Sequence, residues 1–297
     1  MTPEQAARRV GRIFARETTR AGGTWQAYVS VSGAAAPAVA VEPDTVLEAY
    51  SVNKIAVAVA VLDKVDRGLL SLSQRVDVTA DIVVPGGDGI FSLDGAYPSS
   101  VTLGHVLAAL LAVSDDTAVR LCGLVAPAAE INQILLAKGF PNTQVQPVAN
   151  PNRFFLGRST PRETHALLQS LVAGTLLSPS STDALLSRLR APIAFADGIR
   201  REMSSAERLR LATKAGWFAA ARHEAGVVFD AAGAPLLTYA LFADGPAAAA
   251  DDVGGTHPVV TARARMGRAF LDTVDRLTAP APARTARPMT YRPSNSG

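Results

Sequence analysis

Apolar residues are concentrated in one long stretch that runs from Ile55 to about Leu72 and contains few residues that break a helix. Ala, Val and Leu fill most positions of this stretch, so its apolar character covers most of the helical circumference and not one face only. The pattern predicts a helix over 52–68 that is buried in the middle of a domain.

Shorter periodic segments predict the other elements. A three- to four-residue apolar repeat, with caps at Thr102 and Thr160 and with Pro161 at a first helical position, predicts helices. Alternation with β-branched residues and Gly-containing turns predicts strands. The expected helices are 3–20, 102–114, 116–125, 128–139, 159–174, 180–190 and 258–277. The expected strands are 24–33, 38–43, 211–218, 223–233 and 236–245. Residues 79–100 and 140–158 have the composition of loops.

The order of these elements predicts an α/β (α+β) fold. An N-terminal helix and hairpin precede a block of helices, and strands with a closing helix follow. The two ends most simply join into one antiparallel sheet flanked by helices, with an all-helical domain inserted between them. We therefore expect a sheet domain from 1–48 and 200–277, a helical domain from 49–199, and a flexible Pro- and Arg-rich tail from 278–297.

Composition narrows the classes of function. Hydrophobic residues make up 48% and charged residues 19% of the 297 residues, which is typical of a globular protein. The net charge of +3 comes from scattered arginines and predicts no nucleic-acid partner. No run of about 18 uncharged apolar residues occurs, so no membrane partner is expected. The N-terminus has no apolar signal core, and we expect a cytoplasmic protein. The single cysteine, Cys122, lies in an apolar run and is expected to be a buried thiol.

Ser51 and Lys54 lie where the long apolar stretch begins, in the segment YSVNK. Residues three apart share a helix face, so both side chains are expected together on its first turn. Burial pushes a lysine toward its neutral amine, and a neutral amine beside a hydroxyl is a base beside a nucleophile. The alternative reading of these two residues alone is a serine N-cap with a surface lysine.

Two further segments complete an ordered set. Ser114-Asp115-Asp116 falls between two predicted helices, and Lys214-Ala215-Gly216 falls on the first late strand. Their spacings are 63 residues (114 − 51) and 100 residues (214 − 114). The set S-x-x-K, S-D-D, K-A-G resembles the S-x-x-K, S-D-N, K-T-G signature of class A β-lactamases, penicillin-binding proteins and related esterases. The resemblance covers nearly the whole chain apart from the tail and implies a β-lactamase/transpeptidase-like fold.

The resemblance also implies the catalytic roles. Ser51 would attack a carbonyl and hold the acyl group, with Lys54 as its base. Ser114 would pass a proton to the leaving group, and Lys214 would supply positive charge for a substrate carboxylate. The backbone N–H groups of Ser51 and Trp217 would form the oxyanion hole. The resemblance implies no metal and no cofactor.

Three departures from the signature affect the substrate-binding residues. Asp116 stands in place of an asparagine, and a carboxylate accepts hydrogen bonds but donates none. Ala215, beside Gly216, replaces a threonine whose hydroxyl helps to hold a carboxylate. The segment 140–161, which matches the omega loop, contains no Asp or Glu, whereas class A β-lactamases have a water-activating glutamate there. Glu163 follows on the next helix and is a poor substitute.

Two residues each have two possible roles. Arg222, eight residues beyond Lys214, is either a ligand for a substrate carboxylate or an arginine at the surface end of a strand. Phe91, in the Gly-rich loop, is either an aromatic residue at the pocket rim, as the resemblance implies, or a simple anchor for the loop.

The sequence therefore predicts a serine hydrolase or acyltransferase that works through a Ser51 acyl-enzyme. Its substrate would be an ester or amide of a small molecule, and it would be a poor β-lactamase. One alternative is a weak class A β-lactamase or penicillin-binding protein. A second alternative is a non-catalytic ligand-binding protein on the same fold. The natural substrate and the oligomeric state stay open.

Overall fold

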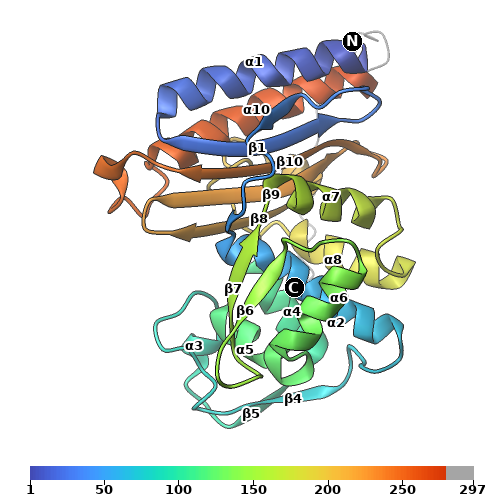
Figure 1. Cartoon of the computed structure of the whole chain (residues 1–297), viewed down its shortest axis with the longest axis vertical. Helices are drawn as coiled ribbons and strands as arrows, with labels where there is room; N and C mark the ends of the chain where they lie inside the picture. Colours follow the sequence, from blue (N-terminus) through green and yellow to red (C-terminus); the bar gives the residue numbers. More distant parts are fainter. Residues whose placement is uncertain (279–297) are drawn as a thin grey trace, which may run out of the picture.

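Strands from both ends of the chain form one antiparallel sheet in this computed structural model, which describes residues 1–278 (Figure 1). The strand order is β2-β1-β10-β9-β8, so the N-terminal hairpin lies beside the three late strands. The strands are β1 (Thr24–Val31), β2 (Val39–Val41), β8 (Leu211–Phe218), β9 (Ala221–Phe229) and β10 (Pro235–Asp244). The predicted antiparallel sheet is confirmed.

Alternate residues of the central strands are buried on opposite faces of this sheet. On β10, Leu237, Tyr239 and Leu241 pack with helices α1 (Pro3–Ala21) and α10 (Pro258–Thr278). Ala240 and Phe242 belong to the other core, which contains the helical block. Figure 1 shows α1 and α10 side by side along one face of the sheet. Because both faces are covered, nearly every residue of β9 and β10 is buried.

The helical block is built around α2 (Lys54–Asp66), the helix expected at 52–68. Residues 55–62 are all at most 2% exposed, which confirms that this helix is buried on all sides. The surrounding helices are α4 (Leu103–Ala112), α5 (Asp116–Val125), α6 (Ala128–Ala137), α7 (Pro161–Val172) and α8 (Pro179–Leu189). The side chains of Thr102 and Thr160 cap α4 and α7 as predicted, and each accepts a hydrogen bond from a backbone N–H.

The segment 140–158 is not the irregular loop that its composition predicted. It contains β6 (Gln144–Pro147) and most of β7 (Phe154–Ser159), which pair antiparallel, and β7 also pairs with β3 (Leu47–Glu48). The register places Arg158 opposite both Glu48 and Gln144. The prediction failed because the Pro- and Asn-rich composition of this segment is typical of a loop and hid the local β6–β7 hairpin. The pairing of β7 with β3 joins segments about a hundred residues apart, so it leaves no local pattern in the sequence.

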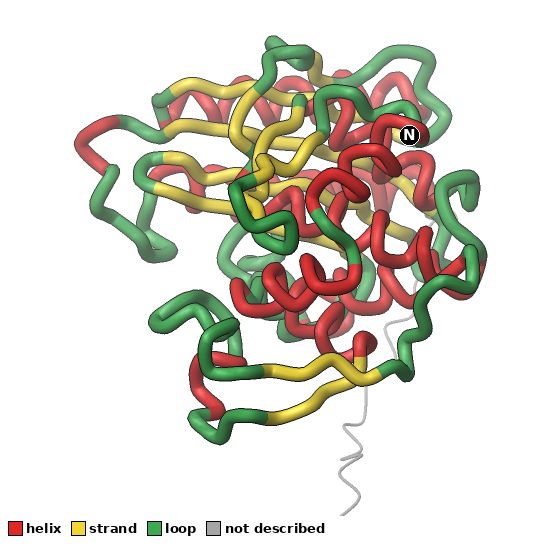
Figure 2. The backbone as a smooth tube through the Cα atoms, turned by 60° about the horizontal axis from the view of Figure 1, so that its bottom comes forward, coloured by secondary structure: helices red, strands yellow, loops and turns green. Residues whose placement is uncertain are grey.

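Several short elements complete the chain. They are η1 (Tyr50–Asn53), β4 (Arg75–Val78), α3 (Phe91–Asp94), β5 (Ser99–Thr102), α9 (Ser205–Arg208) and η2 (Ala247–Ala249). Strands β4 and β5 pair with each other at the edge of the helical block, as Figure 2 shows. Residues 79–100 are therefore mostly loop, as predicted, but with one helical turn at α3. The expected tail, beyond Thr278, lies outside the described residues. The division into domains stays a prediction.

Two features of residues 1–278 bear on partners. Between residues 1 and 278, no single helix is long and apolar enough to span a membrane. Helices α5 and α6 together have the length and composition of a membrane span, but they are bent by 81° from each other. The same range holds no group of three or more His, Cys, Asp or Glu side chains placed to bind a metal ion. Cys122 is fully buried on α5, and this burial raises the pKa of its thiol to about 12.

Two histidines are buried without charge. His165 on α7 lies 2.8 Å from the Ser30 hydroxyl through Nε2, and His223 on β9 is 2% exposed. Burial lowers the pKa of each to about 4, and the nearby guanidinium groups of Arg162 and Arg263 respectively lower it further. Both imidazoles are therefore neutral in the folded protein near neutral pH.

These histidines should make stability depend on pH. Their unfolded pKa is 6.5 and their folded pKa about 4, so between these values only the unfolded chain takes up the protons. We expect the free energy of unfolding in urea to fall as the pH drops from 6.5 to 4, by up to about 3 kcal/mol for each histidine. His165→Gln should reduce this slope, and His105→Gln, on the exposed side of α4, should not. Equal slopes in wild type and His165→Gln would contradict the assignment.

Candidate active site

Ser51 lies on η1, a 3-10 helix of one turn that leads directly into α2. The residue before it, Tyr50, has a φ of 47°, a left-handed conformation that is strained for a bulky side chain. Its ring stacks on Phe218 with a centroid distance of 5.8 Å and lies 5.4 Å from the His223 ring. These contacts hold the sharp turn that presents Ser51.

His223 fixes the chain just before this turn. Its Nδ1 accepts a hydrogen bond of 3.1 Å from the backbone N–H of Ala243, so the proton of the neutral ring must be on Nε2. That Nε2–H lies 3.1 Å from the carbonyl oxygen of Glu48 and donates to it. The sheet is thereby attached to the segment that carries Ser51. His223 is not recognisable from the sequence, because a histidine in the middle of a strand carries no catalytic pattern.

Asn53 attaches the same turn to the helical side. Its Nδ2 donates to the carbonyl oxygens of Leu156 at 2.8 Å and Arg158 at 3.0 Å. One residue before η1, the N–H of Ala49 donates to Gly157 O at 2.9 Å. The turn is therefore held from both sides, by β9 through His223 and by β7 through these backbone contacts.

Lys54 is completely buried behind Ser114. Its ammonium donates to the carbonyl oxygen of Ser114, to Ser114 Oγ at 3.1 Å and to Asp116 Oδ1 at 2.8 Å. Burial lowers the pKa of Lys54 below its ordinary value, and the charge and hydrogen bond of Asp116 oppose this decrease only in part. Asp116 and Lys54 therefore form an ion pair.

Lys214 approaches the same hydroxyl from β8. Its Nζ donates to Ser114 Oγ at 2.9 Å and to the carbonyl oxygen of Ala215 at 2.8 Å. Burial, reinforced by the charge of Lys54, lowers the pKa of Lys214 well below its ordinary value. Ser114 Oγ thus accepts from two lysines, and a hydroxyl has two acceptor positions. Its own O–H remains to donate elsewhere, which is the geometry of a proton relay.

Asp115 and Asp116 hold the loop at 88–91 over the site. Asp116 Oδ2 accepts from the N–H of Asp88 at 3.1 Å. Asp115 Oδ2 accepts from the N–H groups of Ile90 at 2.6 Å and Phe91 at 2.9 Å, while its Oδ1 caps α5. Asp116 therefore faces two donors, the Lys54 ammonium and the Asp88 N–H. These donors bind different carboxylate oxygens, so an amide in the same position would present its oxygen to one of them and its NH₂ group, itself a donor, to the other.

The edge strand β8 passes directly against η1. A Cβ added at Gly216 would lie 2.7 Å from the Ser51 nitrogen and 2.9 Å from the Val52 nitrogen, so only glycine fits there without movement. Trp217 follows with its side chain 46% exposed, and Ala215 before it is buried. The strand thus places the backbone of 215–217 beside the N-terminus of η1, as the predicted oxyanion hole requires.

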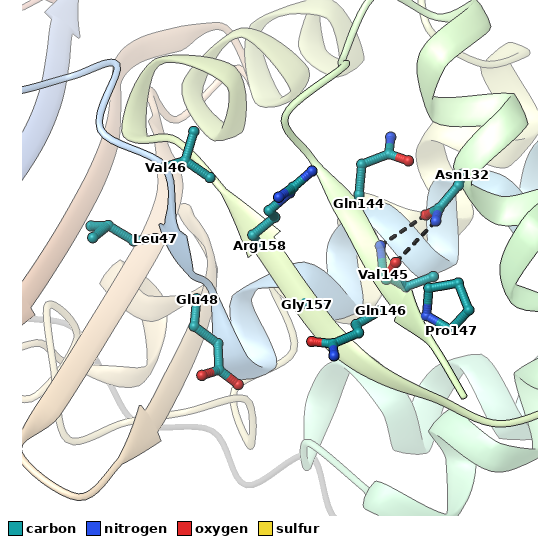
Figure 3. Close-up of a pocket in the computed structure, with 10 residues that line it drawn as sticks. All are labelled: Val46, Leu47, Glu48, Asn132, Gln144, Val145, Gln146, Pro147, Gly157 and Arg158. Atoms are coloured by element: carbon teal, nitrogen blue, oxygen red, sulfur yellow. Dashed lines mark hydrogen bonds between the residues drawn. The ribbon is translucent and has the colours of Figure 1, made fainter. Parts of the chain in front are cut away.

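A cavity of about 330 Å³ opens beside the relay. Its lining includes Ser114, Lys214, Ala215 and Trp217, and it also contains residues that the sequence analysis did not select: Asp88, Leu111, Ala112, Val113, Ile193 and Phe195. A larger cavity, of about 570 Å³, lies over strands β3, β7 and β6, and Figure 3 shows the side chains that line it. None of the three motifs contributes to that larger cavity, so size alone does not identify the site.

Two predicted binding residues, and Glu163, which was expected to be a poor substitute for the omega-loop glutamate, take part in other contacts. Arg222 donates to the backbone oxygens of Ala219, Ala221 and Asp252. It is 3% exposed, so the alternative of an arginine at the surface end of a strand is wrong. Phe91 is 7% exposed and belongs to the core of the helical block, which favours its role as a loop anchor. Glu163 binds the backbone and side chain of Asn142 and the hydroxyl of Thr143.

Comparison with known proteins decides the family. The sequence model described as the Beta-lactamase enzyme family matches residues 5–274. The chain belongs to the beta-lactamase enzyme family. Comparison with curated proteins found no match.

Solved structures of similar proteins agree with this family on the fold. A beta-lactamase from Sphaerobacter thermophilus is 22% identical with a TM-score of 0.74, over 90% of this chain and 96% of that one. A beta-lactamase from Chitinophaga pinensis is 22% identical with a TM-score of 0.73, over 90% and 98%. PBP-A is 22% identical with a TM-score of 0.70, over 89% and 96%. The β-lactamase-like fold is thereby confirmed, and membership of the beta-lactamase enzyme family supports a serine hydrolase.

The close contact of Gly216 with η1 gives a test of the site. Gly216→Ala should push β8 away from Ser51 and slow acylation by a reactive ester about 10²-fold, the usual effect of a misplacement near 1 Å. Acylation would be followed by stopped-flow fluorescence, and circular dichroism would verify the fold. The control is Gly254→Ala, whose added Cβ would lie 3.5 Å from its nearest neighbour. Unchanged acylation by Gly216→Ala would show that this contact does not position the nucleophile.

Proposed function

We propose that this member of the beta-lactamase enzyme family is a serine hydrolase or acyltransferase that forms an acyl-enzyme on Ser51 with an ester or amide of a small molecule. The observation that carries the proposal is the position of Ser114 Oγ, which accepts from Lys54 at 3.1 Å and from Lys214 at 2.9 Å. A hydroxyl held between two buried amines is suited to moving protons, and a structural serine has no need of this arrangement.

The proposed reaction has two steps. In the first, Ser51 Oγ forms a bond to the substrate carbonyl carbon, and its proton moves to the neutral amine of Lys54. The bond from that carbon to the leaving oxygen or nitrogen breaks, and the leaving group takes a proton through Ser114. In the second, water or an acceptor hydroxyl or amine attacks the Ser51 ester, takes the acyl group and returns a proton to the serine.

The omega-loop region supports slow deacylation of β-lactams. Residues 140–161 contain no carboxylate, and the nearest following one, Glu163, is bound to Asn142 and Thr143. An acyl-enzyme that no base helps water to attack is expected to be long-lived. This supports a poor β-lactamase, in which the natural acyl group is smaller or more reactive than that of a β-lactam, or is passed to another acceptor.

Two other functions remain as candidates. A weak β-lactamase or penicillin-binding protein is favoured by one structural relative, a PBP-A mutant solved as an acyl-enzyme complex with penicillin G, which is 21% identical with a TM-score of 0.69 over 92% of this chain. A non-catalytic binding protein is favoured by the altered motif residues Asp116 and Ala215. The intact mass of the protein after incubation with an ester or a penicillin separates these candidates.

The acyl-enzyme is tested by intact mass. Wild type incubated with p-nitrophenyl acetate or penicillin G should gain the acyl mass, and the penicillin adduct should persist for minutes or longer. Ser51→Ala should show no adduct and no turnover, and Lys54→Ala should acylate about 10²- to 10⁴-fold more slowly, which is the typical value of general-base help.

The matched control is Ser92→Ala on α3, which removes a hydroxyl outside the three motifs and should acylate like wild type. An adduct on Ser51→Ala would show that another residue is the nucleophile. Absence of any adduct in wild type would favour the binding protein. Rapid penicillin turnover, above about 10 s⁻¹, would favour a true β-lactamase.

Asp116 should set the pH range of acylation. Its carboxylate favours the ammonium form of Lys54, so its removal lowers the pKa of that lysine further. Because Lys54 acts as a base only when neutral, Asp116→Asn should shift the rising limb of the pH–rate profile toward lower pH. Stopped-flow acylation by an ester and by a penicillin over a range of pH measures this. Asp94→Asn removes the same charge from α3 without a contact to Lys54 and should leave the profile unchanged. A profile of Asp116→Asn that matches wild type would exclude Asp116 from the site.

A further inference from the structure

The cavity beside Ser114 is the space that receives the leaving group, if Ser51 is the nucleophile as proposed. The hydroxyl that delivers a proton must lie next to the atom that receives it, and Ser114 is that hydroxyl. Ser114 and Lys214 line the cavity of about 330 Å³. The chemistry of the other lining residues therefore indicates what leaving group fits there.

Apolar side chains form much of the lining. Ile193 is 73% exposed and Trp217 is 46% exposed, and Phe195 lies half-buried between solvent and the cavity. Large apolar side chains that remain exposed at a concave site lose contact with water when a ligand covers them, which favours apolar ligands. Leu111 and Val113 extend the same apolar surface at the level of the relay.

The positive groups that could hold a carboxylate are largely engaged elsewhere. Arg222 donates to three backbone carbonyl oxygens. Lys214 is 2% exposed and donates to Ser114 Oγ and to the carbonyl oxygen of Ala215, so at most one of its N–H groups is free. Position 215 is an alanine and offers no hydroxyl.

The charges around the cavity are also unfavourable for an anion. Asp88 lines the cavity and is exposed, and among residues 1–278 no hydrogen bond or ion pair engages its side chain. Asp88, Asp115 and Asp116 all act on the charge of Lys54. Two lysines with lowered pKa values are thus accompanied by three carboxylates, and one of these, Asp88, belongs to the cavity lining.

We propose that this cavity takes an uncharged apolar leaving group, an alcohol or amine without a carboxylate, and that Asp88, Ile193 and Trp217 determine this preference. Asp88 disfavours anionic leaving groups by charge repulsion, and the two apolar side chains favour larger hydrocarbon groups. The substrate class differs from that of β-lactams, in which the departing amine carries a carboxylate.

The charge preference is measured with two acetyl esters that differ in one group. They are 4-acetoxyphenylpropanoic acid and its methyl ester, in which two methylenes separate the carboxyl group from the ring and keep the phenols similar as leaving groups. Wild type should show a kcat/KM at least roughly fivefold higher for the methyl ester, the effect of one close like charge in a wet site. Asp88→Asn should reduce this ratio. Asp94→Asn, which removes a charge from the same loop region outside the cavity, should leave the ratio unchanged.

The apolar preference is measured with 4-methylphenyl and 4-butylphenyl acetate. The gain in kcat/KM for the butyl compound should be at least about tenfold in wild type, in line with methylenes in an apolar pocket. Ile193→Ser should reduce the gain, and Trp217→Ala should do so as well. Leu93→Ser is the control, because Leu93 is 79% exposed but outside the cavity lining.

The outcomes separate this inference from the proposed function. If no ester is consumed and no adduct forms on Ser51, the proposed function fails, and the assignment of the leaving-group cavity fails with it. If esters are consumed but the acid and its methyl ester react equally, or Asp88→Asn leaves their ratio unchanged, the charge preference is wrong while the acyl-enzyme stands. Equal rates for the methyl and butyl compounds in wild type would overturn the apolar preference.

Discussion

Burial of two lysines beside one hydroxyl is the constraint on which the rest of the site depends. Lys54 and Lys214 both donate to Ser114 Oγ, and both have pKa values lowered by burial. Two cations placed close together out of water are unstable unless a counter-charge is present or protons are lost. Asp116 supplies the counter-charge to Lys54, and the lowered pKa values favour loss of a proton. The tendency of this group to exchange protons is therefore a consequence of the packing.

The fold creates this constraint by bringing three elements to one point. Helix α2 is buried on all sides and carries Lys54 in its first turn, α5 begins just after Ser114, and the edge strand β8 carries Lys214. The hydrogen bonds of Lys54 and Lys214 to Ser114 form only while the sheet and the helical block keep their relative positions. The contact of Gly216 with η1 and the hydrogen bond from His223 to Glu48 connect the sheet to the segment that carries Ser51.

The substitutions in the motifs are consistent with the charges around Lys54 and Lys214. Asp116 satisfies two donors, Lys54 and the Asp88 N–H, where an amide would satisfy one. With Asp88 at the cavity, the site becomes richer in negative charge, and Ala215 removes a hydroxyl that a carboxylate would use. These changes act in the same direction, toward a reaction on an uncharged group. They leave in place the hydrogen bonds from Lys54 and Lys214 to Ser114, on which the proposed acyl-enzyme chemistry depends.

The sequence by itself determined the elements whose information is local. The apolar run after Ser51 defines α2, the caps at Thr102 and Thr160 mark the starts of α4 and α7, and the ordered motifs select Ser51, Lys54, Ser114 and Lys214. Only the tertiary structure decided the β3-β7-β6 sheet, because β3 pairs with β7 about a hundred positions later and the β6–β7 hairpin has the composition of a loop. It also decided the roles of His223, Asn53 and Arg222, whose hydrogen bonds run to backbone atoms of distant segments and leave no pattern along the chain. The same reason applies to the cavity: Asp88 and Ile193 are ordinary loop residues until the fold places them beside Ser114.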